Sequence, residues 1–177
     1  MEAIKKLVRS LNLDNNNGYT VSVLIALILV SILVASYYVL LRPPQKGFMT
    51  IYLLDSHKKA VNYPELLVIN QNNTFNVWVT VENHMGKTLP FEVRLKITED
   101  ANLTFPVAAE AKNAYAATLE NGGKWETSAT TTIEKPGNYM VVFELWAYDE
   151  ESGALQFTGN ACVLNVEAEA VLSNPNQ

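Results

Sequence analysis

The chain has 177 residues, a net charge of −5 at pH 7, one cysteine and two histidines. A single cysteine excludes a disulfide within the chain. The charge is uneven, because residues 1–42 hold 4 basic and 2 acidic residues whereas residues 43–177 hold 9 basic and 16 acidic ones. Nucleic-acid binding needs clustered basic residues that replace phosphate counterions, so we expect no nucleic-acid partner.

Residues 1–18 form a short basic tail before the first long apolar segment. Apolar residues recur there at helical spacing while basic residues fall on other faces: Ile4, Leu7, Val8 and Leu11 against Lys5, Lys6 and Arg9. Two interpretations stay open, a short amphipathic helix in the headgroup layer or a solvated tail. The sequence DNNNG at 14–18 predicts a turn-like break before the next element.

Residues 19–41 contain no charged side chain. A helix of about 20 residues, rising 1.5 Å per residue, crosses a hydrocarbon layer of about 30 Å. A cleaved signal peptide has an apolar core of about 7 to 15 residues and ends at small residues. This run is longer and ends near Tyr37, Tyr38 and Arg42, so we interpret it as a retained signal-anchor in membrane lipid.

Charges beside the apolar segment predict its orientation. Lys5, Lys6 and Arg9 precede it, whereas Arg42 and Lys46 follow it. Basic residues stay preferentially on the cytoplasmic side. We therefore expect a single-pass protein of the cell membrane, with a cytoplasmic N-terminus and an extracellular C-terminal domain.

The predicted membrane helix also contains two pairs of small residues at four-residue spacing. Small residues let helix backbones approach closely in a membrane. The pairs are candidates for packing against partner helices: Ser22 with Ala26, and Ser31 with Ala35.

After a linker at 42–47, residues 48–170 are predicted to be one β-domain, and residues 171–177 a frayed tail. Apolar and polar residues alternate with period two in 75–82 and 91–98, as in half-buried strands. Further strands are predicted at 47–55, 65–70, 123–135, 138–149 and 155–168. About seven strands with frequent turns favour an all-β, immunoglobulin-like antiparallel sandwich, with a Greek-key barrel as the alternative.

Two connections in the β-domain are less regular. The sequence NHMGKT at 83–88 predicts a hairpin loop, with Gly86 available for a positive φ angle. The alanine-rich segment 101–119 is compatible with an edge strand and a long crossing loop, or with one short helical turn.

Two tryptophans are candidates for binding a protein partner or a glycan. By alternation, Trp78 lies opposite the core valines of its strand, and Trp146 shares an outer face with Val142 and Glu144. Exposed aromatic rings anchor protein partners and stack on sugars. The competing interpretation is that a loop such as 101–119 covers them.

Other polar positions have weaker signals. Asn83 and His84 are candidate partner contacts, although a hydrogen bond back to the local backbone explains them equally well. Asn72 and Asn102 begin Asn-X-Thr sequons and are candidate glycosylation sites.

No catalytic or metal-binding pattern stands out. His57 and His84 are predicted in turns and are not paired with a cysteine cluster. The acidic run at 149–151 lacks the regular spacing of a calcium loop, so solvated charge is the better interpretation. Cys162 is expected to be a buried strand residue. We therefore expect no enzyme activity and no cofactor.

Several short motifs occur in a recognisable order. Ile51–Leu54 lies in the first strand, Tyr63–Pro64 leads into the next, and a valine-rich strand ends in Asn83–Gly86. Further along are Leu119 with Trp125 six residues later, Pro136–Gly137, and the apolar strand Met140–Leu145.

On these motifs, which span residues 48–166, the chain resembles the archaeal membrane-protein family known as domain of unknown function sixteen-sixteen. Met85 stands where that family tends to have Glu, and its members often have several membrane segments. The resemblance implies an architecture and an archaeal envelope setting, without an assigned chemistry.

The sequence thus predicts a membrane-anchored, non-catalytic binding or assembly module of the cell envelope, with a partner in the membrane or surface layer. The alternative is an accessory subunit of a membrane enzyme complex that handles glycans or exported proteins.

Overall fold

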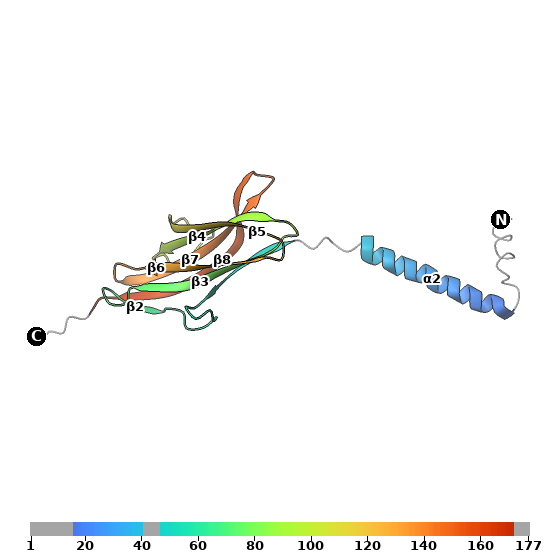
Figure 1. The fold of residues 1–177 in the computed structure, drawn as a ribbon, viewed down its shortest axis with the longest axis horizontal. Coiled ribbons are helices and arrows are strands. Elements are labelled where there is room, and N and C mark those ends of the chain that lie inside the picture. The colour runs from blue at the N-terminus through green and yellow to red at the C-terminus, as the bar shows by residue number, and fades with distance from the viewer. Residues whose placement is uncertain (1–15, 41–46, 172–177) are drawn as a thin grey trace, which may run out of the picture. The chain divides into compact units, whose positions relative to one another are not determined.

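The computed structural model describes residues 16–40 and 47–171. The helix and the β-domain belong to two separate compact units, residues 1–45 and 46–177 (Figure 1). The described elements are helix α2 (Asn16–Leu40) and strands β1 (Phe48–Leu54), β2 (Leu66–Val68), β3 (Thr74–His84), β4 (Leu89–Thr98), β5 (Ala111–Leu119), β6 (Lys124–Thr132), β7 (Gly137–Asp149) and β8 (Ala154–Glu169).

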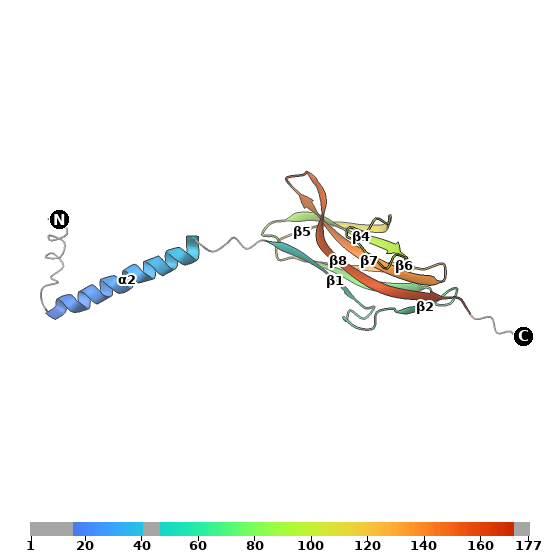
Figure 2. The same ribbon diagram turned by 180° about the vertical axis from the view of Figure 1, so that it is seen from behind.

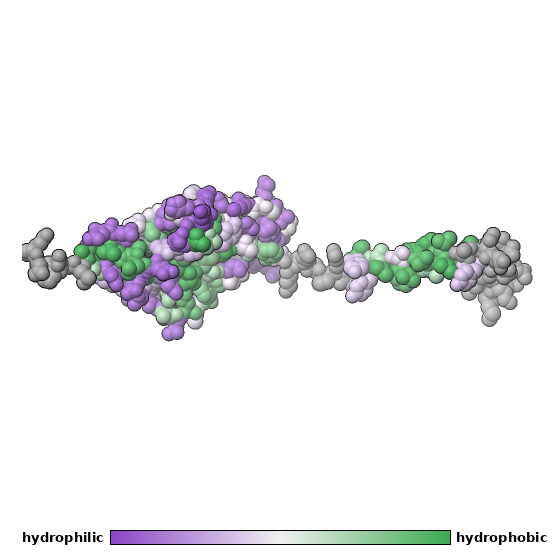
Figure 3. Space-filling model, turned by 90° about the horizontal axis from the view of Figure 1, so that it is seen from below, coloured by the Kyte–Doolittle hydropathy of each residue, from purple (hydrophilic) through white to green (hydrophobic). Residues whose placement is uncertain are grey.

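Helix α2 is apolar along most of its length (Figure 3). Its segment Val21–Leu40 is long and apolar enough to cross a membrane, and none of that segment is buried by protein. A signal sequence near the N-terminus meets the same criterion. The helix begins at Asn16, so the break predicted at 14–18 is wrong for Asn16–Gly18. Residues 1–15 of the predicted basic tail, residue 41 of the predicted helix, residues 42–46 of the linker and residues 172–177 of the predicted frayed tail lie outside the described residues.

The β-domain is an immunoglobulin-like sandwich, as predicted. One sheet has the order β1-β3-β6 and the other β2-β8-β7-β4-β5 (Figures 1 and 2). Within the described residues no ladder joins the two sheets, so the alternative of a closed Greek-key barrel is wrong. All pairings are antiparallel except that of β2 with β8. The chain changes sheet repeatedly, which gives the Greek-key connections of this fold.

The core forms from the alternating residues of β3 and β4. Val77, Val79 and Val81 of β3 have 0% exposure, and Phe91 and Val93 of β4 have at most 1% exposure. Successive side chains on a strand point to opposite faces, so each strand delivers every second residue to the space between the sheets. Each such burial contributes about 1.5–3 kcal/mol.

The connection at 83–88 is not the hairpin that the sequence predicts. β3 ends at His84 in the three-stranded sheet, whereas β4 begins at Leu89 in the five-stranded sheet. Two alternating strands next to each other in sequence can face one another across a core instead of pairing. Gly86 nevertheless has the predicted positive φ, at 79°.

The alanine-rich segment divides into a covering loop and an edge strand. Residues 99–110, called the cover segment below, have no regular structure, and β5 follows at the edge of the five-stranded sheet. β7 is buried on both faces, with Val142 and Glu144 at 0% exposure, and Val107 of the cover segment contacts Glu144. The outer face predicted for these residues is therefore covered.

Candidate functional site: two outer sheet faces

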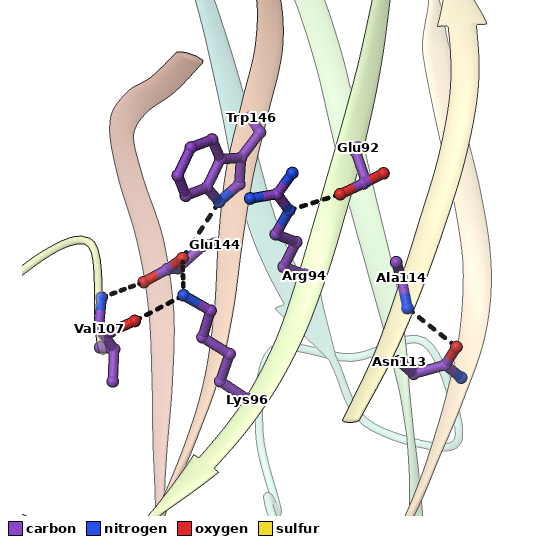
Figure 4. Close-up of polar contacts among 8 residues, drawn as sticks. All are labelled: Glu92, Arg94, Lys96, Val107, Asn113, Ala114, Glu144 and Trp146. Carbon is purple, nitrogen blue, oxygen red and sulfur yellow. Dashed lines mark hydrogen bonds and ion pairs between the residues drawn. The ribbon is translucent and has the colours of Figure 1, made fainter. Parts of the chain in front are cut away.

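A buried ion pair fastens the cover segment to the five-stranded sheet (Figure 4). Lys96 Nζ lies 2.9 Å from Glu144 Oε2, with side-chain exposures of 8% and 0%. Lys96 Nζ also donates to the Val107 carbonyl at 2.6 Å, and the Val107 N–H donates to Glu144 Oε1. Buried charges persist when they are paired and hydrogen-bonded, so this cluster is a closed structural unit.

Trp146 lies beside this cluster and is half-buried. Its Nε1–H donates to Glu144 Oε2 at 3.1 Å, and the Arg94 guanidinium lies 4.0 Å from its ring centroid. Arg94 is held in turn by an ion pair with Glu92 (Figure 4). Trp146 therefore lacks the bare ring face that the sequence suggested.

The accessible aromatic surface lies next to Trp146, on residues that the sequence analysis missed. The Phe157 ring lies 5.8 Å from the Trp146 ring, and Phe105 of the cover segment stacks on Phe157 at 6.1 Å. Phe105 is 46% exposed. No local pattern signals this row, because cross-strand pairing and the cover segment bring its members together.

Trp78 lies on the outer face of the other sheet, so the two tryptophans do not form one site. Lys58 Nζ lies 4.0 Å from the Trp78 ring centroid. Lys58 and Lys124 each lie 2.9 Å from a different oxygen of Glu126. Hydrogen bonds from Lys58 and then Lys124 lower the pKa of Glu126 to about 2.

Asn83 is not a partner contact, because its side chain has 0% exposure. Its amide donates to the carbonyls of Lys87 and Leu119, each at 2.8 Å, and its oxygen accepts from the Met85 N–H at 2.9 Å. The neighbouring His84 is exposed, 3.5 Å from a Glu82 oxygen and beside the Phe48 ring. Asn83 thus ties the crossing between the sheets to the end of β5.

The remaining candidate residues lie apart from one another. Asn72 and Asn102 are both exposed in loops, where a glycan has access. Cys162 is half-buried with Sγ 3.4 Å from the Ile51 carbonyl, and burial raises its pKa to about 11. Hydrogen bonds from Ser152 lower the pKa of Asp149.

The acidic turn does not assemble a metal site. The Glu150 carboxylate pairs with Lys87 at 2.9 Å. Among the described residues, no group of three or more histidine, cysteine or acidic side chains could hold a metal ion.

No family model matches the chain, and no curated protein matches it in sequence. Among solved structures, it is similar to the CARDB domain of the PF1109 protein from Pyrococcus furiosus, crystallised in complex with di-metal ions. The identity is 13% over 71% of this chain and 90% of that chain, with a TM-score of 0.47.

The solution structure of the same CARDB domain gives 16% identity over 70% and 95% of the two chains, with a TM-score of 0.48. A β-glucosidase from Listeria innocua is 15% identical over 71% of this chain but only 17% of its own, with a TM-score of 0.46. These likenesses carry no functional inference.

Replacing Lys96 by Met is expected to destabilise the β-domain by about 3–5 kcal/mol, because it leaves the Glu144 carboxylate buried without its partner. Denaturant unfolding of the full chain in detergent, followed by tryptophan fluorescence, measures the change. The double variant K96M/E144L should recover most of the loss, and Lys59→Met, at an exposed loop residue, should change little. A K96M protein as stable as wild type would contradict the assignment.

Replacing Asn83 by Ala is expected to cost about 2–4 kcal/mol, because the carbonyls of Lys87 and Leu119 and the Met85 N–H lose their hydrogen-bond partner, and the Leu119 contact is buried. The matched control is His84→Ala, one residue along on the exposed face, which should change the free energy of unfolding by less than about 0.5 kcal/mol. Equal effects of the two substitutions would argue against the role of Asn83.

The depressed pKa of Glu126 predicts an acid-sensitive contribution to stability. The folded pKa of about 2 lies below the ordinary value of 4.5, so ionised Glu126 stabilises the fold above pH 4.5. This contribution is lost as the pH falls from 4.5 to 2. The stability difference between wild type and Glu126→Gln should therefore shrink over that interval. A difference independent of pH between 6 and 2 would contradict the prediction.

Proposed function

We propose that this protein is a membrane-anchored, extracellular, non-catalytic binding or assembly module of an archaeal cell envelope. The observation that carries the proposal is the apolar segment Val21–Leu40, of which no part is buried by protein. Only residues 41–47 separate α2 from β1 of the folded sandwich. An apolar helix without protein cover needs lipid or partner helices around it.

Charge and loop exposure support the extracellular side. The basic residues Lys5, Lys6 and Arg9 precede the helix, and residues 43–177 carry the acidic excess. The exposed sequon residues Asn72 and Asn102 are compatible with glycosylation there. The archaeal setting rests on the family resemblance alone.

The positions of the small helix residues favour display over packing against a single partner helix. Ser22 and Ser31 are nine residues apart, which at about 100° per residue puts their pairs on opposite sides of the helix. Ser31 also donates its hydroxyl to the Leu27 carbonyl at 2.8 Å. A complex subunit with one packing face would have both pairs on one side.

The location is tested with tagged full-length protein in its native membranes. We expect an intact chain in the membrane fraction after carbonate washing, and digestion of the β-domain by protease added to whole cells. The double variant L29K/L33K should leave the membrane, because each charge at the helix centre costs about 2.5–3.5 kcal/mol. Leu66→Lys, at an exposed residue of β2, is the control and should remain membrane-bound.

Other outcomes overturn separate parts of the proposal. A soluble mature chain without the apolar segment would identify a signal peptide. Protection from protease until the cells are opened would reverse the orientation. A stoichiometric membrane partner in a pulldown from gently solubilised membranes would favour the accessory-subunit alternative.

A further inference from the structure

The two sheets of the sandwich differ in width, and the difference is concentrated on one side. The five-stranded sheet ends at β5, whereas the three-stranded sheet ends at β6. Leu95 of β4 points into the core, and Asn113 is its partner on β5. Asn113 therefore faces inward yet is exposed, because among the described residues no strand lies beyond β6 to cover it.

A groove opens where the cover is missing. It is lined by the ends of β4 and β5, by β6, and by the connection from β6 to β7: Leu95, Ile97, Lys112, Asn113, Thr130–Lys135 and Tyr139. Its apolar floor includes Leu95 and Ile133, both buried. The groove thus reaches the core between the sheets.

One lining side chain lacks a hydrogen-bond partner. Thr131 has 3% exposure, and its Oγ1 is the one buried side-chain polar atom among the described residues without a hydrogen bond. Buried polar atoms in native proteins are almost always satisfied. The Thr131 hydroxyl therefore has hydrogen-bonding capacity left for a group that enters the groove.

The nearby edge of β6 is unprotected. Native edge strands are commonly blunted by charged side chains or proline. The charges of β6 are Lys124 and Glu126, and residues 127–132 contain none, nor any proline. Three threonines occupy positions 130–132, and threonine is favoured in strands.

The charged side chains at the groove indicate which charge the side chains of a partner would carry. Lys112 and Lys135 are exposed at its mouth and have no ion pair within the described part of the chain. Glu134 is the one acidic residue in the lining, and Glu99 lies near the lining residue Tyr139, where it helps to raise the pKa of that phenol after the larger effect of burial. Lys112 and Lys135 are therefore two cationic groups at the mouth of this groove without an ion pair among the described residues, in a domain whose residues 43–177 are strongly acidic.

We propose that this groove binds an extended segment of a partner protein, which pairs with the free edge of β6 as a fourth strand. The backbone of the segment hydrogen-bonds to β6 and brings a partner for the Thr131 hydroxyl. Its inward side chains cover the apolar floor, and its acidic side chains lie opposite Lys112 and Lys135. This is strand addition to a sheet edge, in which the backbone supplies affinity and alternate side chains supply specificity.

The inference deepens the binding role proposed above, but its test is independent of location. The probe is a capped nine-residue peptide of alternating valine and threonine with glutamate at both ends. Its control has lysine at both ends. The purified full chain in detergent is titrated with each, and hydrogen exchange is followed by mass spectrometry.

We expect the glutamate peptide to slow exchange in residues 127–133 and to bind at least fivefold more tightly than the lysine peptide. The net charge of the domain would produce the opposite preference, so this order reports the local groove. Reversing both K112E and K135E should weaken glutamate-peptide binding about tenfold, as expected for two surface charge pairs. Lys59→Glu, at an exposed lysine that does not line the groove, should leave the affinity within twofold.

Thr131→Val separates binding from folding. Valine has nearly the same shape without the hydroxyl, so the variant should unfold at a higher denaturant concentration and yet bind the peptide more weakly. A variant that gains stability and keeps full affinity overturns the part assigned to Thr131.

Three results overturn the proposal as a whole. One is no added protection in residues 127–133 with either peptide at millimolar concentration, and another is equal binding of both peptides. The third is self-association in sedimentation that the peptide competes away, which would identify a second copy of this chain as the occupant.

Discussion

Glu144 lies without solvent exposure in the middle of β7, where its carboxylate accepts hydrogen bonds from Lys96, Trp146 and the backbone of Val107. A buried carboxylate needs such hydrogen bonds and a charged partner, because desolvating an unpaired charge costs several kcal/mol. The hydrogen bonds of Val107 with Lys96 and Glu144 hold the cover segment against the sheet, on the face of β7 that also carries the buried Val142. The outer face of β7 is therefore a second small core, and its polar centre fixes where the loop lies. The accessible aromatic row at Phe105 and Phe157 follows from the same arrangement.

The second constraint is the unequal width of the two sheets. Covering the inner face of β5 would require a fourth strand beside β6, and the chain within its described residues does not supply one. The consequences converge on one side of the domain: the inward but exposed Asn113, the orphan Thr131 hydroxyl and the groove between them. The opposite side shows no such deficit, because Asn160 and Cys162 of β8 contact the carbonyls of Met49 and Ile51 on β1. The two sheets thus contact each other at the β1–β8 side of the domain and leave a groove at the β5–β6 side.

Charged side chains also differ between the outer face of the three-stranded sheet and the groove. On the outer face of the three-stranded sheet, Glu126 is held by two lysines, and Trp78 is capped by one of them. These charged groups and the Trp78 ring already contact one another, so few of their charges and ring faces are free to contact a partner. Lys112 and Lys135, in contrast, are exposed at the groove without an ion pair among the described residues. For a protein held at a membrane surface even weak contacts gain effective concentration, so a modest strand-addition site is sufficient for assembly.

Sequence alone determined the features that depend on local period and composition: the apolar helix, the strands with alternating valines, the positive φ of Gly86 and the two-sheet class of fold. It misjudged the features that depend on which strands pair. Residues 83–88 cross between the sheets because β3 and β4 face each other through the core. Two strands paired in a hairpin would show the same alternation of apolar and polar residues. Asn83 has the composition of a turn residue, and only the position of the Leu119 carbonyl makes it a buried tie. The face of Trp146 was assigned correctly, but its ring is contacted by Arg94 of β4 and Phe157 of β8, which only strand pairing places beside it. The open groove beside β6 is likewise invisible in the sequence, because an unfilled strand position exists only once the two sheets are stacked and their widths can be compared.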